Sequence, residues 1–112
     1  MKFFDKPLTK SELEEIQKEF GSYVKITADI ENKWIVVGCE LHADGEQILL
    51  EKGSEQDNIW GGGINFPNKI IDTTAVLNLR PRLGNDSMEI LDIQRREKFV
   101  SIVRDYFKEL WH

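Results

Sequence analysis

The chain has 112 residues, of which 40% are hydrophobic and 31% are charged, and its formal net charge is −5. This length and composition predict one globular domain over residues 1–112 rather than a disordered chain. The net negative charge argues against broad binding to nucleic acid or to an anionic membrane. Cys39 is the only cysteine, which excludes an internal disulfide, and no segment is long and apolar enough to span a bilayer. We therefore expect a cytoplasmic protein.

The first predicted element is a helix that begins after Thr9. Glu12 follows three residues later, which is the spacing of a capping box, and Gly21 is placed to end the helix. Leu13 and Ile16 begin a stripe at helical spacing, so we expect one face of this helix to be buried.

Two strands are predicted next, over residues 23–30 and 34–39, with a short turn between them. Apolar and polar side chains alternate in the first strand, while the second is nearly all apolar and β-branched, as expected of a central strand. The pair is typical of a β-hairpin. The polar face of the first strand carries Tyr23, Lys25, Thr27 and Asp29.

Residues 42–53 fit two patterns. Asp44-Gly45 is a hairpin-turn signal and favours a third strand over residues 46–51, whereas the Glu, Gln and Leu residues favour a short helix that ends at Gly53. We predict the strand, because a glycine inside so short a helix would cost about 1 kcal/mol.

The rest of the chain predicts two more strands and a second long helix. Residues 59–66 read as a strand around three glycines, which indicate a bulge or a close backbone approach. Residues 70–79 alternate like a strand, residues 80–87 form a loop, and a helix begins near Asp92. The element order predicts an α+β fold, with a mainly antiparallel sheet of four to five strands and the N-terminal and C-terminal helices packed on one face.

The middle of the chain and the late loop also resemble a known family. The pieces that carry the resemblance are Glu40-Leu41-His42-Ala43-Asp44, Leu49-Leu50-Glu51 with Gly53-Ser54 and Gln56, Trp60-Gly61 with Asn65, Asn78-Leu79-Arg80-Pro81, Gly84-Asn85 and Ser87-Met88-Glu89. Their order and spacing are similar to those of a small prokaryotic family, the domain of unknown function number 5674. Two features depart from it: the run of three glycines after Trp60 is longer than the family's Trp-Gly-x-Asn, and Asp86 stands where a basic residue is expected. Because that family is uncharacterised, the resemblance implies no activity.

The only internal histidine, His42, lies in a run that also holds the carboxylates Glu40, Asp44 and Glu46. His42 and Glu46 are neighbours in either structure of this segment, across a hairpin turn or four residues apart in a helix. Such a histidine could bind a divalent metal or act as a general base. The alternative is that these groups only complete a hairpin end. Since the spacing matches no established metal motif, we predict no metal site, and the sequence identifies no cofactor.

The late loop is the second candidate. All five arginines of the chain lie from residue 80 onward. Their guanidinium groups, together with backbone N–H groups of the loop and a serine hydroxyl, could hold a phosphate or carboxylate. The alternative is that Arg80 pairs with a carboxylate, Glu40 or Asp44, and pins the loop to the domain. The polar groups of this loop are Arg80, Arg82, Asn85, Ser87 and Glu89.

Trp60 and the glycines after it are the third candidate. A tryptophan beside bare backbone can form one wall of a ligand groove, with Asn65 nearby. The alternative is that Trp60 belongs to the core.

These observations lead to three hypotheses of function. The first is a domain that binds a small ligand or anion without turnover, which requires the three candidate segments to converge. The second is a structural module that forms a homodimer through a sheet edge or the last helix. The third is a small metal-dependent hydrolase that uses His42, with Asp44 or Glu46 as its partner. The residues predicted for the ligand site are Glu40, His42, Asp44, Glu46, Trp60, Asn65, Arg80, Asn85 and Ser87.

Overall fold

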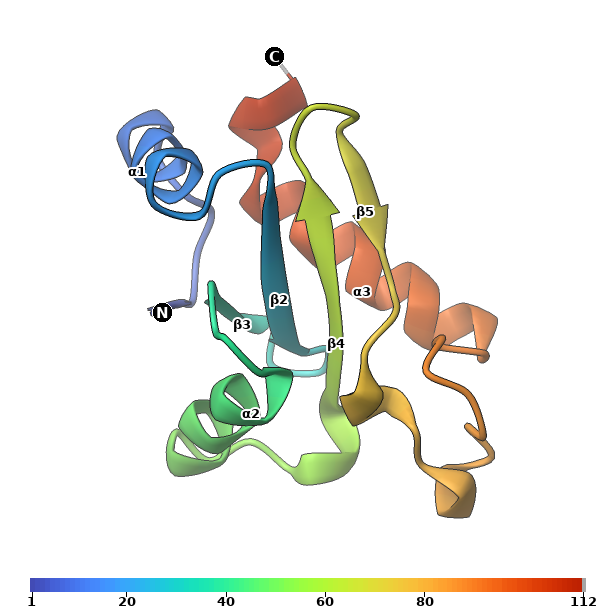
Figure 1. Ribbon diagram of the computed structural model, residues 1–112. Coiled ribbons are helices and arrows are strands. Elements are labelled where there is room, and N and C mark those ends of the chain that lie inside the picture. The colour runs from blue at the N-terminus through green and yellow to red at the C-terminus, as the bar shows by residue number, and fades with distance from the viewer. Residues whose placement is uncertain (112) are drawn as a thin grey trace.

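The computed structural model describes residues 1–111 and shows a five-stranded antiparallel sheet with three α-helices (Figure 1). The strand order across the sheet is β1-β3-β2-β4-β5. The strands are β1 (Lys2–Phe4), β2 (Tyr23–Asp29), β3 (Trp34–Val37), β4 (Ile59–Asn65) and β5 (Ile70–Asp72), and the helices are α1 (Lys10–Phe20), α2 (His42–Glu51) and α3 (Ile93–Tyr106). The predicted α+β fold with an antiparallel sheet is confirmed.

Both terminal helices begin where the sequence predicts. The Thr9 hydroxyl accepts the Glu12 N–H at 3.1 Å, and the Glu12 carboxylate accepts the Thr9 N–H at 2.9 Å, which completes the capping box of α1. The Asp92 carboxylate accepts the Arg95 N–H at 3.2 Å and caps α3. These caps satisfy N–H groups that have no partner within the helix, so the start of each helix is set locally.

Helices α1 and α3 lie on one face of the sheet, as predicted. The main hydrophobic core joins Ile16 of α1 and Phe99 of α3 to Val24 and Ile26 of β2. All four side chains are almost completely buried. Figure 1 shows α3 crossing behind β4 and β5, so this core fills the space between the sheet and the terminal helices.

Helix α2 packs on the opposite face, and the prediction of a strand over residues 46–51 is wrong. Leu49 of α2 joins Val36 of β3 and Ile59 of β4 in a second hydrophobic cluster. Gly45 faces the sheet, where an added Cβ would lie 2.5 Å from Thr27 Oγ1. The glycine that argued against a helix is therefore what allows the helix to pack closely on β2, and this packing outweighs its low helix propensity.

The strand predicted over residues 70–79 ends early. The Asp72 carboxylate accepts the Thr74 N–H at 3.1 Å, which turns the chain away from the sheet, and residues Val76–Asn78 form a short 3₁₀ turn. The alternation therefore reflects pairing with β4 only as far as Asp72, and beyond it Thr74 forms a single bridge with Glu89.

Strand β1 pairs with β3 at the other edge of the sheet, from Lys2 opposite Val37 to Phe4 opposite Ile35. The sequence did not predict it, because three residues are too few to show a periodicity.

Strand β4 pairs with β2 along its whole length, from Asn65 opposite Tyr23 to Ile59 opposite Asp29. The register has no extra residue, so the three glycines of β4 do not form a bulge. They allow other groups to approach the backbone closely, which was the second explanation for them.

No helix within residues 1–111 is long and apolar enough to cross a bilayer.

We expect Gly45→Ala to lower the free energy of unfolding by about 1–3 kcal/mol, because its methyl group overlaps Thr27. Urea unfolding measures the change. Gln47→Ala, an exposed change on the same helix, is the control and should stay within about 0.5 kcal/mol of the wild type. A gain of about 1 kcal/mol for Gly45→Ala, as helix propensity alone predicts, would contradict close packing here.

Candidate functional site

His42 is the first residue of α2, and its side chain reaches down to the middle of β4. Its Nε2 atom lies 2.8 Å from the carbonyl oxygen of Gly62. A Cβ added to Gly61 would lie 2.8 Å from His42 Cδ2. The imidazole can therefore reach the strand backbone only because residue 61 has no side chain.

The contact with Gly62 determines which nitrogen of His42 carries a proton. A carbonyl oxygen only accepts, so Nε2 must donate, and in the neutral ring Nδ1 then carries the lone pair. Burial lowers the pKa of His42, and the positive charge of Lys25 acts in the same direction, while the Gly62 carbonyl and Asp72 act in the opposite direction. His42 is therefore mainly neutral at pH 7. Its Nδ1 atom makes no hydrogen bond within residues 1–111.

A cavity of about 350 Å³ opens beside this histidine, and we call it the His42 cavity. Its walls are mainly apolar. Two of the wall residues are unusually exposed for hydrophobic side chains, Leu41 at 60% and Val76 at 74%. The lining residues are Lys25, Leu41, His42, Ala43, Val76 and Leu77.

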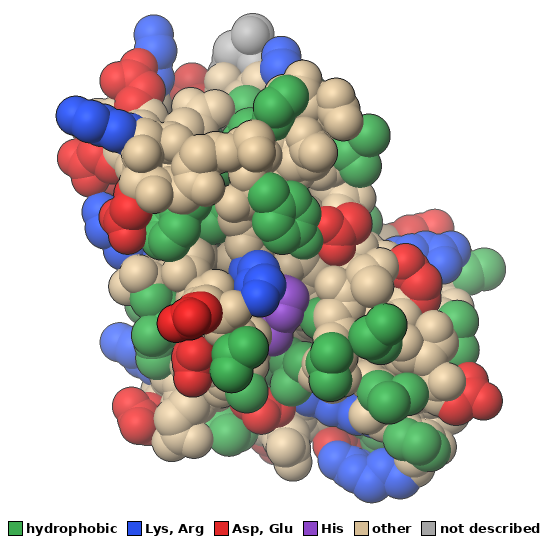
Figure 2. Space-filling model, viewed as in Figure 1, with side chains coloured by type: hydrophobic (Ala, Val, Ile, Leu, Met, Phe, Trp, Pro, Cys, Tyr) green, Lys and Arg blue, Asp and Glu red, His purple; other side chains and the backbone are tan. Residues whose placement is uncertain are grey.

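Lys25 supplies the positive charge at this cavity. Its Nζ atom donates to the carbonyl oxygen of Glu40 at 2.5 Å, and its two other N–H groups have no partner within the described chain. Figure 2 shows the histidine near the centre of one face of the molecule, against a basic side chain and with hydrophobic side chains around it. In Figure 1, α2 lies on this face of β2 and β4, while α3 lies on the opposite face.

Tyr23 and Asp72 form a second polar pair on this face of the sheet. The Tyr23 hydroxyl donates to the Asp72 carboxylate at 2.6 Å. Burial, together with this carboxylate, raises the pKa of Tyr23 far above its usual range, so the phenol remains neutral. Tyr23 also lies over Gly63, where a Cβ would be 2.1 Å from its hydroxyl oxygen. Each glycine of β4 that faces this side thus makes room for a side chain of the site.

The three carboxylates near His42 in sequence do not gather around it. Asp44 accepts the Leu41 N–H at 3.3 Å and so helps to begin α2. Glu46 lies one helical turn from His42, as its spacing predicts, but its carboxylate binds Arg80. Glu40 is exposed, and only its carbonyl oxygen takes part in the site. Within residues 1–111, no group of three or more His, Cys, Asp or Glu side chains could hold a metal ion.

Arg80 is buried at the edge of β4 and ties the late loop to α2. Its Nη2 atom lies 3.2 Å from the Glu46 carboxylate, and the two side chains are only 9% and 15% exposed. Its Nη1 atom donates to the Ile59 carbonyl at 2.6 Å, and its guanidinium lies 4.8 Å from the centre of the Trp60 ring. Arg80 thus has the pinning role that was the alternative to anion binding, with Glu46 rather than Glu40 or Asp44 as its partner.

Asn85 is buried and holds the late loop together. Its amide nitrogen donates to the carbonyls of Asn78, Ser87 and Glu89 at 2.7, 3.0 and 2.8 Å, and its oxygen accepts the Leu91 N–H at 2.8 Å. The Ser87 hydroxyl accepts the Glu89 N–H at 3.1 Å. Both polar side chains are used by the loop itself.

Trp60 and Asn65 also take part in internal contacts. Trp60 is fully buried, and its indole N–H donates to the Asp57 carbonyl at 3.0 Å. Asn65 accepts the Asn68 N–H at 3.2 Å in the turn after β4. A core position fits Trp60 better than the wall of an open groove.

The three candidate segments do converge. His42 donates a hydrogen bond to the Gly62 carbonyl, and Arg80 donates to both the Glu46 carboxylate and the Ile59 carbonyl. Of the residues that we predicted, His42 lines an open cavity. The other lining residues, Lys25, Leu41, Ala43, Val76 and Leu77, were not predicted. Of these five residues, only Lys25 could have been found from the sequence, because it lies on the polar face of the first predicted strand.

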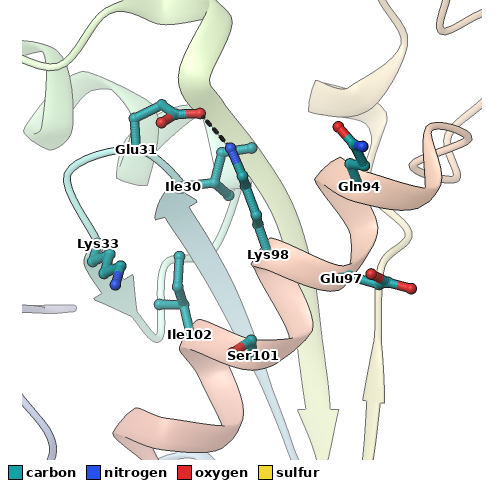
Figure 3. A pocket seen from close by; sticks show the side chains of 8 residues that line it. All are labelled: Ile30, Glu31, Lys33, Gln94, Glu97, Lys98, Ser101 and Ile102. Atoms are coloured by element: carbon teal, nitrogen blue, oxygen red, sulfur yellow. Dashed lines mark hydrogen bonds and ion pairs between the residues drawn. The ribbon is translucent and has the colours of Figure 1, made fainter.

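A larger hollow of about 570 Å³ lies on another part of the surface, between the β2–β3 turn and α3 (Figure 3). Ile30 and Ile102 lie at its centre, and an ion pair of 2.8 Å between Glu31 and Lys98 crosses one side. Both partners of that pair are half exposed. Because its charged groups are of both signs and largely face solvent, this hollow selects less clearly for one kind of ligand than the His42 cavity does.

A family model described as "Protein of unknown function (DUF5674)" matches residues 2–106. The chain belongs to this family. The resemblance found in the sequence is thereby confirmed, and the match also includes the whole of α1 and α3. Comparison with curated proteins and with solved structures gave no match. Membership in this family does not imply a particular activity, so the geometry of the chain's own site is the guide to the function of this DUF5674 member.

We expect Glu46→Ala to lower the free energy of unfolding by about 3 kcal/mol, because it leaves the buried Arg80 guanidinium without its carboxylate. Urea unfolding is the measurement. The control is Asp57→Ala, which removes the partner of Arg82 in an exposed ion pair and should change the unfolding midpoint little. Equal effects of the two changes would contradict a pinning role for Arg80.

The lowered pKa of His42 predicts a loss of stability in acid. The unfolded chain takes up a proton near the ordinary histidine pKa of about 6.5, while the folded protein resists it, so His42 contributes its full stability above this pH and loses it as the pH falls through the folded value. His42→Gln can still donate to Gly62 but does not titrate. Urea unfolding at pH 8 and pH 5 should therefore show a larger loss for the wild type than for His42→Gln. Parallel losses in the two proteins would show that the pKa is not lowered.

Proposed function

We propose that this protein binds a small ligand with an apolar body and an anionic head in the His42 cavity, without chemical turnover. The observation that carries the proposal is the meeting of Lys25 and His42 at a cavity whose other walls are apolar. An apolar pocket with a few convergent polar groups is the usual form of a small-molecule site.

The charge at the cavity favours an anion over a cation. Lys25 contributes a positive charge and has two unused N–H donors. Asp72, the carboxylate of the sheet whose charge acts on His42, already accepts hydrogen bonds from the Tyr23 hydroxyl and the Thr74 backbone. A carboxylate head would therefore gain a charge-assisted hydrogen bond from Lys25.

The apolar walls favour a ligand with a hydrocarbon portion. Leu41 and Val76 stand on the surface at 60% and 74% exposure, and a ligand in the cavity would cover part of this apolar area. A volume of about 350 Å³ is at the small end of ligand pockets, which favours a metabolite-sized molecule over a large cofactor.

Hexanoate and hexylamine test the proposal, because they share one apolar chain and differ in the sign of the head group. In ¹⁵N-resolved NMR titrations of the full chain, we expect hexanoate to shift the amide signals around residues 41–43 and 76–77 more strongly than hexylamine does. We expect Lys25→Gln to weaken hexanoate binding by about tenfold, as loss of one charge-assisted hydrogen bond predicts.

The control is Lys18→Gln, which removes an exposed lysine from α1 and should leave the hexanoate affinity unchanged. Equal responses to the two compounds, or an unchanged hexanoate affinity in Lys25→Gln, would contradict an anion site at this cavity.

A further inference from the structure

We propose that the ligand of the His42 cavity carries a hydrogen-bond donor next to its carboxylate, as a 2-hydroxy acid does, with Lys25 binding the carboxylate and His42 Nδ1 accepting the hydroxyl proton. This inference rests on the proposed function and specifies the class of ligand. It makes His42 the residue that distinguishes a hydroxy acid from a plain fatty acid.

The fixed position of the imidazole supports an acceptor at Nδ1. Nε2 is held at 2.8 Å from the Gly62 carbonyl, which can only accept a hydrogen bond. The ring edge lies against Gly61 so closely that an added Cβ would be 2.8 Å from Cδ2. With the ring held against the strand in this way, Nδ1 is the nitrogen left for a ligand.

The groups around His42 keep that acceptor in place at neutral pH. Lys25 on β2 is the nearby cation and disfavours a second positive charge on the ring. Asp72 on β5 is the carboxylate that acts on His42 from the sheet, and both of its oxygens already accept hydrogen bonds. On α2 itself, Asp44 and Glu46 are bound to other partners. No group within residues 1–111 supplies Nδ1 with a donor, so this acceptor is available to a ligand.

The arrangement of the two polar groups suits a donor and a carboxylate on neighbouring carbons. Lys25 and His42 line the same small cavity, and the charge of Lys25 acts on the imidazole. A plain carboxylate would turn one oxygen lone pair toward the lone pair of Nδ1, which is unfavourable. A hydroxyl on the next carbon instead gives Nδ1 a proton to accept, and a site built to bind such a group discriminates against analogues that lack it.

Three probes with the same chain test this assignment in the wild-type protein: 2-hydroxyhexanoate, 2-methoxyhexanoate and hexanoate. By NMR titration or calorimetry at pH 8, we expect 2-hydroxyhexanoate to bind about tenfold more tightly than the other two, the value of one hydrogen bond. The methoxy compound keeps an oxygen on that carbon but has no proton to donate and is one methyl group larger, while hexanoate is smaller. Weaker binding of both compounds therefore separates the hydrogen bond from an effect of size. Equal binding of all three would overturn the inference and leave the proposed function standing, whereas failure of all three to bind would overturn both.

Two further measurements assign the preference to His42. In His42→Leu, which keeps an apolar group at this place, we expect the preference for 2-hydroxyhexanoate to disappear while hexanoate still binds. In the wild type at pH 8, we expect the ¹⁵N signal of His42 Nδ1 to shift more on addition of 2-hydroxyhexanoate than of hexanoate, because only the hydroxyl donates a proton to this nitrogen. This second measurement needs no substitution. A preference that persists in His42→Leu, or equal shifts of the Nδ1 signal with the two compounds, would show that another group binds the hydroxyl.

Discussion

The closeness of α2 to the sheet, which two glycines permit, is the contact on which the rest of the structure depends. A Cβ at Gly45 would lie 2.5 Å from Thr27 Oγ1, and one at Gly61 would lie 2.8 Å from the His42 ring. Because α2 lies so close to the sheet, Leu49 reaches the second hydrophobic cluster and His42 reaches the Gly62 carbonyl. The same position brings Glu46 within 3.2 Å of Arg80. Hydrophobic burial, the buried ion pair and the candidate site thus share one packing constraint.

Side chains replace a strand where β5 ends. Beyond Asp72, the Asn78 amide accepts the Gly61 N–H at 2.8 Å and donates to the Gly61 carbonyl at 2.9 Å, as a neighbouring strand would. Arg80 completes the edge by binding the Ile59 carbonyl. No buried polar side-chain atom of the described residues lacks a partner. The polar groups of the late loop therefore serve the fold, while Lys25 and His42 retain hydrogen-bonding capacity for a ligand.

The parts of the fold that were predicted correctly depend on neighbours in sequence. The Thr9 and Asp92 caps bind N–H groups three residues away, and the residues that form β2 alternate over a full strand. The strand predicted over residues 46–51 failed because the conformational cost of Gly45 was weighed without the contact that compensates for it. In the site, His42 was recognised by its chemistry. Lys25 was placed on the correct face of its strand but was not recognised as a site residue. The sequence does not show that α2 covers only part of that face and leaves a cavity beside Lys25.

By itself, the sequence determined the terminal helices, the central hairpin, the family and the segment in which to look for a site. Short-range capping, periodicity and a characteristic order of residues carry that information. The tertiary structure alone decided which polar groups are structural and which remain free. The partner of His42 is 20 residues away, and the partner of Arg80 is 34 residues away. Such pairings follow from how closely α2 and β4 pack, and no local pattern in the chain records that distance.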